Sequence, residues 1–71
     1  MTALIPTLTV NGQTRPLGDA STLAQLLDAL GVNVRRMAVE RNGEIVPPAA
    51  FATTPVAAGD QIEIIQFVGG G

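Results

Sequence analysis

Two Asn-Gly pairs restrict the fold of this chain more than any other feature of its sequence. They are Asn11-Gly12 and Asn42-Gly43. Both central positions of a type I′ turn require positive φ, which these two residue types tolerate best. Each pair lies between segments of strand length, so the sequence predicts two β-hairpins. The expected strands are Thr7–Val10 with Gln13–Leu17, and Met37–Arg41 with Glu44–Val46.

One amphipathic helix is expected between the two hairpins. Leucines at positions 23, 26, 27 and 30 repeat at the spacing of a single helix face. Ser21 or Thr22 is expected to cap the first turn, and Thr22 with Gln25 has the spacing of a capping box. Gly31 suits the left-handed position that follows the end of a helix. The predicted helix covers about Thr22–Leu30.

The segment after the second hairpin contains turn signals and one further strand. Pro47 and Pro48 end the preceding strand, and Ala49–Ala52 is expected to form a single helical turn. After a turn at Gly59, the run Gln61–Val68 is rich in strand-forming residues and predicts the last strand. These elements predict an α+β protein with the β-grasp arrangement. In this arrangement one main helix covers one face of a mixed sheet, here of four to five strands.

The composition excludes several kinds of chemistry. The chain has 71 residues, no cysteine and no histidine, and its four basic residues are all arginine. It can therefore offer no disulfide, thiolate nucleophile, Schiff-base lysine or histidine base. We expect no catalytic residue of its own and no metal site. The net charge of −2 argues against nucleic acid as a partner, and the short apolar runs argue against a membrane span. A cytoplasmic protein is expected.

Three glycines end the sequence directly after the apolar last strand. Gly69, Gly70 and Gly71 have no side chain to pack and lose much conformational entropy when they are ordered. One interpretation is a frayed terminus. The other is a slender probe that reaches about 10 Å when extended and carries the Gly71 carboxylate into a partner. Because a carboxylate reacts only after activation, that partner must supply the chemistry. We expect a domain over residues 1–68 and a flexible tail over residues 69–71.

The sequence resembles a known family, most clearly in its second half. The similarity is strongest over Val39–Pro47 and Gly59–Gly71, and it extends over essentially the whole chain. These segments are similar to the ThiS family, the sulfur carriers of thiamine biosynthesis. The resemblance implies a ubiquitin-like β-grasp fold. It also implies that an E1-like adenylating enzyme activates the C-terminal glycine with ATP and magnesium, and that the adenylate becomes a thiocarboxylate with sulfur from a donor protein. The thiocarboxylate then donates its sulfur to thiazole synthase.

The resemblance assigns roles to individual residues of the tail. Gly71 would be the residue that is adenylated and converted to the thiocarboxylate, while Gly69 and Gly70 would enter the partner enzymes. The carrier itself would bind no cofactor, because its partner uses the ATP and magnesium. The sequence departs from the family at Pro48 and Phe51, where members often carry a basic residue and an indole.

The last strand is also expected to present a docking surface. If Ile62 and Ile64 face the helix, then Ile65 and Phe67 face away from it, because side chains alternate along a strand. Single exposed apolar residues are ordinary on protein surfaces. A pair beside the tail nevertheless suits a surface on which partner enzymes dock.

Other polar and core residues have simpler interpretations. Arg35, Arg36 and Arg41 are interpreted as solvated cations, with pairing to a partner as the alternative. Asp60 is expected to accept hydrogen bonds from nearby backbone amides in its turn. Met37 is expected to fill the core.

Three other functions fit the same features. The chain could be the small subunit of molybdopterin synthase, whose tail stays inserted in a large subunit. It could be a ubiquitin-like modifier that forms isopeptide bonds with other proteins. It could also be a β-grasp interaction module whose tail has no function.

Overall fold

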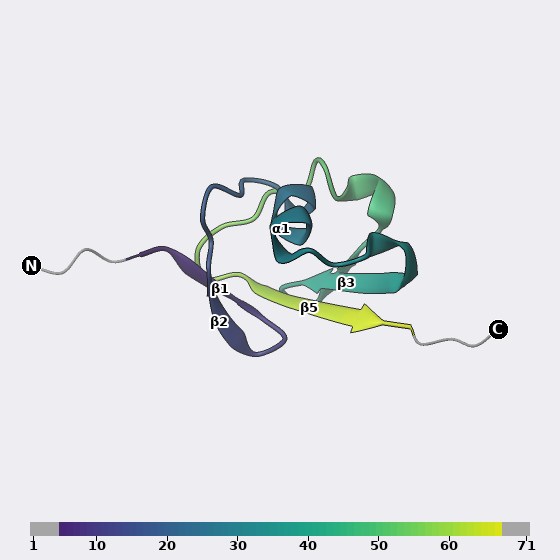
Figure 1. The fold of residues 1–71 in the computed structure, drawn as a ribbon, viewed down its shortest axis with the longest axis horizontal. Helices are drawn as coiled ribbons and strands as arrows, with labels where there is room; N and C mark the ends of the chain where they lie inside the picture. Colours follow the sequence, from purple (N-terminus) through teal and green to yellow (C-terminus); the bar gives the residue numbers. More distant parts are fainter. Residues whose placement is uncertain (1–4, 68–71) are drawn as a thin grey trace, which may run out of the picture.

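In the part of the chain that the structure describes, a five-stranded sheet carries a single α-helix on one of its faces (Figure 1). The computed structural model describes residues 5–67 of the chain. The elements, in chain order, are β1 (Thr7–Val10), β2 (Gln13–Pro16), α1 (Leu23–Leu30), the 3₁₀ turn η1 (Val34–Arg36), β3 (Met37–Arg41), β4 (Glu44–Val46), the 3₁₀ turn η2 (Pro48–Ala50) and β5 (Gln61–Gln66).

The last strand occupies the centre of the sheet. The strand order is β2-β1-β5-β3-β4, so β5 separates the two predicted hairpins. β5 runs parallel to β1 and antiparallel to β3, whereas both hairpins are antiparallel. The sheet is therefore mixed, and the predicted α+β, ubiquitin-like β-grasp fold is confirmed with five strands.

Both hairpin turns use the predicted asparagines. Asn11 and Asn42 adopt positive φ angles of 51° and 52°. β2 ends at Pro16, one residue earlier than expected. The Leu17 amide still donates to the Pro6 carbonyl at 3.0 Å. Pro6 has no N–H to donate in return, so the ladder of paired hydrogen bonds stops there.

The helix has the predicted caps at both ends. The Thr22 hydroxyl accepts a hydrogen bond from the Gln25 amide, and the Gln25 side chain accepts one from the Thr22 amide. Thr22 is therefore the N-cap, and the helix proper begins at Leu23. Gly31 follows the helix with a left-handed φ of 70°. The capping box and the glycine stop are confirmed.

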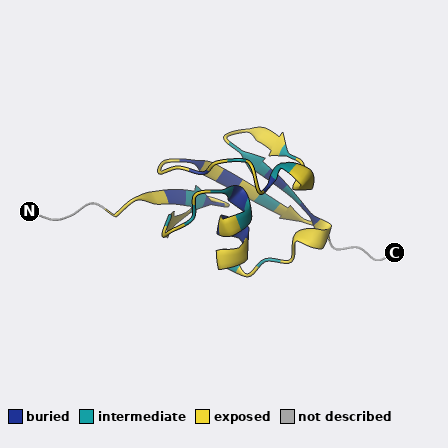
Figure 2. Ribbon diagram, turned by 90° about the horizontal axis from the view of Figure 1, so that it is seen from above, coloured by how far each residue is buried: buried dark blue, intermediate teal, exposed yellow. Residues whose placement is uncertain are grey.

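The core lies between α1 and the sheet, and Figure 2 shows buried segments on both the helix and the strands. Met37 is buried there, as predicted. Phe51 is also buried, so at this position an aromatic ring fills the core. The buried hydrophobic residues are Leu8, Val10, Leu23, Leu26, Leu27, Met37, Val39, Phe51, Val56 and Ile62.

Two element boundaries in the second half differ from the sequence prediction. The expected helical turn near Ala49–Ala52 forms as the 3₁₀ turn η2, one residue earlier, because Pro48 at its start has a φ already suited to a helix. β5 ends at Gln66, whereas Val68 lies outside the described residues. The turn η1 was not predicted, and the Asn33 side chain caps it by accepting from the Arg35 amide.

Candidate functional site

The face of β5 turned away from α1 presents the two predicted docking residues. Ile62 is fully buried and Ile64 is half-buried against the core, so these two side chains face the helix. Ile65 is 47% exposed and Phe67 is 59% exposed. The predicted alternation along the last strand is therefore confirmed, and both residues lie on the open face of the sheet.

Sheet register adds residues from β3 and β4 to this open face. Ala38 lies directly opposite Ile65. On the same face, Glu40 lies between Glu63 of β5 and Ile45 of β4. Ile45 is 71% exposed. We call Ala38, Ile45, Ile65 and Phe67, with the two glutamates Glu40 and Glu63 between them, the outer-face patch.

Sequence reasoning missed Ile45 as a member of this patch. β4 has only three residues, so it shows too little alternation to reveal which face each side chain occupies. Its pairing with β3 was predicted, however, and that register places Ile45 on the same face as Glu40. The hairpin turn at Asn42-Gly43 was therefore the signal that could have found it.

The last described residue of the chain is Phe67, and in the sequence Val68 separates it from the predicted tail. The Phe67 amide donates to the carbonyl of Arg36, the last residue of η1 before β3, at 2.9 Å, so this hydrogen bond holds the chain up to Phe67. Gly69, Gly70 and Gly71, which were predicted to enter the partners, lie outside the described residues.

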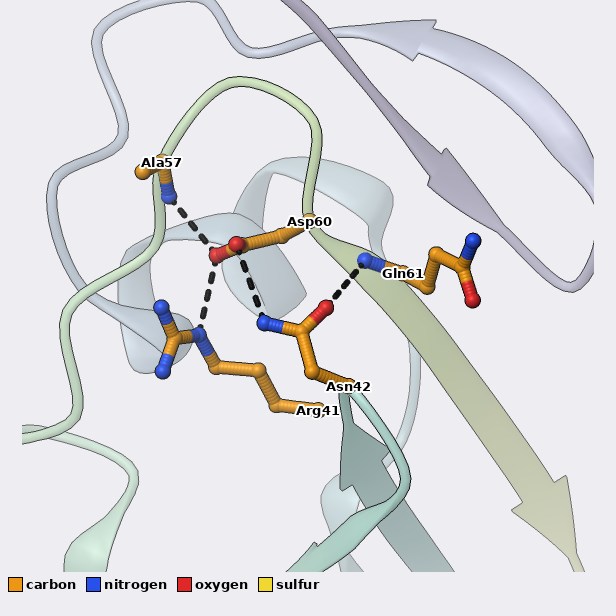
Figure 3. Close-up of polar contacts among 5 residues, drawn as sticks. All are labelled: Arg41, Asn42, Ala57, Asp60 and Gln61. Atoms are coloured by element: carbon orange, nitrogen blue, oxygen red, sulfur yellow. Dashed lines mark hydrogen bonds and ion pairs between the residues drawn. The ribbon is translucent and has the colours of Figure 1, made fainter.

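A buried carboxylate fixes the start of β5 (Figure 3). Asp60 Oδ2 accepts from Arg41 Nε at 2.9 Å and from the Ala57 amide at 2.8 Å. Its Oδ1 accepts from Asn42 Nδ2 at 3.2 Å. The Asn42 side chain also accepts from the Gln61 amide at 2.8 Å. These bonds join the β3–β4 turn to the first residue of β5, the strand that leads to the tail.

The charge of Asp60 is stabilised by its partners. Burial alone would raise the pKa of this carboxyl. The hydrogen bonds from Arg41, the Ala57 amide and Asn42, together with the Arg41 charge, outweigh burial and lower the pKa below its usual value. The predicted amide contact of Asp60 is confirmed. The interpretation of Arg41 as a solvated cation is wrong, because the β3–β5 register brings it to this buried acid.

Among residues 5–67 there is no group of three or more side chains that could hold a metal ion. No helix in this range is long and apolar enough to cross a membrane. Arg35 and Arg36 are both exposed. The candidate functional feature of the described residues is the outer-face patch, which extends to Phe67, the last described residue before the tail.

The strand order, the single helix and the central last strand define a ubiquitin-like β-grasp protein. The fold matches the crystal structure of the thiamine biosynthesis protein ThiS from Geobacter metallireducens with a TM-score of 0.78 and 40% sequence identity. That match covers 92% of this chain and 99% of the other. The ThiS family model matches residues 8–71, and the chain belongs to the ThiS family.

Two curated relatives differ in length. The sulfur carrier protein ThiS of Thermus thermophilus is 32% identical over 62 residues, which cover 87% of this chain and 95% of the relative. The thiazole synthase of Paramagnetospirillum magneticum is 47% identical over 64 residues, which cover 90% of this chain and 20% of the relative. This chain thus spans about one fifth of the length of the curated thiazole synthases that it matches.

Proposed function

We propose that this protein is the sulfur carrier for thiazole formation in thiamine biosynthesis. The observation that carries the proposal is the ThiS family match, which runs from the first strand through all three terminal glycines to Gly71. The relative from Thermus thermophilus, which this chain nearly covers, is named a sulfur carrier protein. The protein acts as a co-substrate of other enzymes and not as an enzyme.

The proposed chemistry takes place at the α-carboxylate of Gly71. An E1-like adenylating enzyme joins this carboxylate to the α-phosphate of ATP, with magnesium, and releases pyrophosphate. Sulfur at the oxidation level of sulfide, supplied by a donor protein, then displaces AMP and leaves a thiocarboxylate. Thiazole synthase then takes the sulfur in exchange for an oxygen, which returns Gly71 to a carboxylate. Gly69 and Gly70 suit this role because a segment without side chains can enter a narrow channel. Because adenylation consumes ATP, the proposal places the carrier in the cytoplasm.

The outer-face patch is the proposed docking surface for these enzymes. Ile65 and Phe67, a few residues before the tail in the sequence, supply exposed apolar area, and Ile45 adds to it on the same face of the sheet. Glu40 and Glu63 lie directly opposite each other, and neither has an ion pair within residues 5–67. Two like charges in this position repel each other in the free protein. A partner surface that is apolar at its centre and basic at these two points would relieve that repulsion.

Intact mass spectrometry tests the proposed chemistry. The protein is incubated with the adenylating enzyme, ATP, magnesium and a sulfur source. We expect the mass to change by one exchange of oxygen for sulfur. Variants that lack Gly70 and Gly71, or that carry one extra residue after Gly71, should keep the fold but show no mass change. An unchanged mass of the wild type beside an active adenylating enzyme contradicts the proposal.

The wild type and the variant without the tail also distinguish the alternative functions. A stable complex with the large subunit of molybdopterin synthase, and none with thiazole synthase, would indicate the small subunit of that enzyme. Covalent adducts on lysines of other proteins would indicate a modifier. A plain interaction module would keep every partner and every activity after the tail is removed.

A further inference from the structure

A side chain takes the place of a strand on one edge of β5. β1 pairs with β5 only through Thr9 and Val10, and the chain then turns at Asn11. The Asn11 side chain continues the pairing. Its Oδ1 accepts from the Ile64 amide at 2.7 Å, and its Nδ2 donates to the Ile64 carbonyl at 3.2 Å. The carboxamide thus imitates one more residue of backbone.

Beyond Ile64, this edge of β5 is open at Gln66. Backbone groups in a ladder point alternately to the two neighbouring strands. The Gln61 carbonyl and the Phe67 amide bond to the β3 side, so the odd-numbered residues face β3. The even-numbered residues face β1, as the bond from the Asn11 amide to the Ile62 carbonyl shows. The Gln66 N–H and C=O therefore face the β1 side, where no described residue bonds to them.

The open edge lies in a groove of about 430 Å³ between the end of the hairpin and the end of α1. Its apolar part includes Leu30, Val32 and Ile64, and its polar part includes Gln13 and Arg15. An extended chain that pairs with Gln66 would lie along this groove. Alternate side chains of such a chain would point into it.

The groove carries an unpaired positive charge. Arg15 is exposed and makes no ion pair within residues 5–67, and no acidic side chain lines the groove. Guanidinium groups bind carboxylates through charge-assisted hydrogen bonds. The groove therefore matches an extended segment with an acidic side chain placed to meet Arg15.

We propose that thiazole synthase contributes this segment, as a strand that adds to β5 at Gln66 and places an acidic side chain on Arg15. The inference rests on the proposed function. Gly71 lies five residues after Gln66, so an enzyme that takes the tail lies within about 18 Å of this edge. In relatives that are named thiazole synthases, a segment similar to this chain belongs to the same polypeptide. Strand addition to an open sheet edge is a common mode of peptide recognition.

Hydrogen exchange of the Gln66 amide tests the added strand directly. In the free carrier we expect this amide to exchange fast while the Phe67 amide is protected. Bound to the cognate thiazole synthase, the Gln66 amide should exchange at least about tenfold more slowly. Unchanged exchange at Gln66 in a complex that does form overturns this inference and leaves the carrier function standing. Protection by the adenylating enzyme alone, with none by thiazole synthase, also overturns it.

Matched variants test the charge and the edge separately. R15E should weaken binding to thiazole synthase about tenfold, whereas R35E makes the same charge change at an exposed arginine outside the groove and should bind normally. Q66P removes the unpaired N–H and should weaken binding, whereas Q66A keeps it and should not. Melting temperatures check that the variants fold. If Q66P does not fold, the binding of R15E and the hydrogen exchange of Gln66 still test the inference. Equal binding by R15E and R35E overturns the inference. A wild-type carrier that binds no thiazole synthase overturns both this inference and the proposed function.

Discussion

Asp60 shows how one side chain can join segments that are distant in the sequence. It is the buried charged residue among residues 5–67, at 7% exposure. Its three donors come from the end of β3, from the following turn and from the loop before β5. A buried carboxylate is costly unless its oxygens accept hydrogen bonds, and here both of them do. The start of β5 is therefore fixed by polar contacts as well as by packing.

Replacing Asp60 should destabilise the protein in a pH-dependent way. D60A leaves Arg41 and the Ala57 amide without their acceptor and should lower the free energy of unfolding by about 2 kcal/mol at pH 7. Because the folded-state pKa of Asp60 is lowered, its stabilisation is complete above the unfolded pKa of about 3.9. It is lost as the pH falls through the folded pKa.

Urea unfolding at pH 7 and at pH 3 measures this effect. The difference in stability between wild type and D60A should shrink at pH 3. D19A, at an exposed aspartate, is the control and should change stability by less than about 0.5 kcal/mol at either pH. A difference between wild type and D60A that is as large at pH 3 as at pH 7 would refute the role of the charged carboxylate.

At the scale of elements, the first turn of α1 depends both on local capping residues and on a loop that is distant in the sequence. It has eight residues, which is too short for an isolated helix to be stable in water. The Thr22 and Gln25 side chains accept hydrogen bonds from backbone N–H groups at the start of the helix. The Leu23 amide donates to the Thr54 carbonyl, and the Ala24 amide donates to the Phe51 carbonyl. The loop after η2 thus completes the cap that the local sequence begins.

The two candidate cap residues can be distinguished by mutation. Thr22 is the N-cap, so T22A should lower the free energy of unfolding by about 1 kcal/mol. Within residues 5–67 the Ser21 hydroxyl hydrogen-bonds only to the Gln25 side chain, so S21A should cost less than half as much. Thermal unfolding followed by circular dichroism measures both. A larger loss for S21A than for T22A would show that the helix begins differently in solution.

The facing glutamates of the outer-face patch, Glu40 and Glu63, should lower the stability of the free protein. E40K replaces the repulsion across β3 and β5 with an attraction to Glu63 and should stabilise the free protein by about 0.5 kcal/mol. E40Q removes only the repulsion and should have a smaller effect. The difference between the two variants should fall in 1 M salt, because salt screens exposed charges. Denaturant unfolding would contradict the prediction if E40K were no more stable than E40Q.

At the scale of the whole molecule, the helix and the proposed docking surface occupy opposite faces of one sheet. α1 covers one face of the sheet (Figure 1), and the residues of the outer-face patch lie on the other. β5 is central, so β1 pairs with its first two residues and β3 pairs with it as far as Gln66. The outer-face patch therefore lies outside the core, where a partner could contact it without disturbing the packing.

Charge substitutions on the two faces should separate docking from folding. I65R places a charge in the centre of the outer-face patch and should weaken binding to the adenylating enzyme about tenfold or more. A29R makes a comparable change on the exposed side of α1, on the opposite face, and should bind normally. Both variants should melt close to wild type, because both sites are exposed. Binding by calorimetry that is equally weak, or equally strong, for the two variants argues against this docking surface.

The amino-acid sequence by itself determined the local parts of the molecule. Positive φ at Asn11 and Asn42, the cap at Thr22 and the stop at Gly31 depend on residues a few positions apart, so spacing reveals them. The alternation of Ile62, Ile64, Ile65 and Phe67 was readable for the same reason.

Only the tertiary structure decided how these parts meet. The central place of β5, the pairing of Arg41 with Asp60, the addition of Ile45 to the outer-face patch and the open edge at Gln66 all depend on register between distant segments. Pairing register follows from the packing of the whole core, because a shift of one residue would turn every side chain of a strand to the other face.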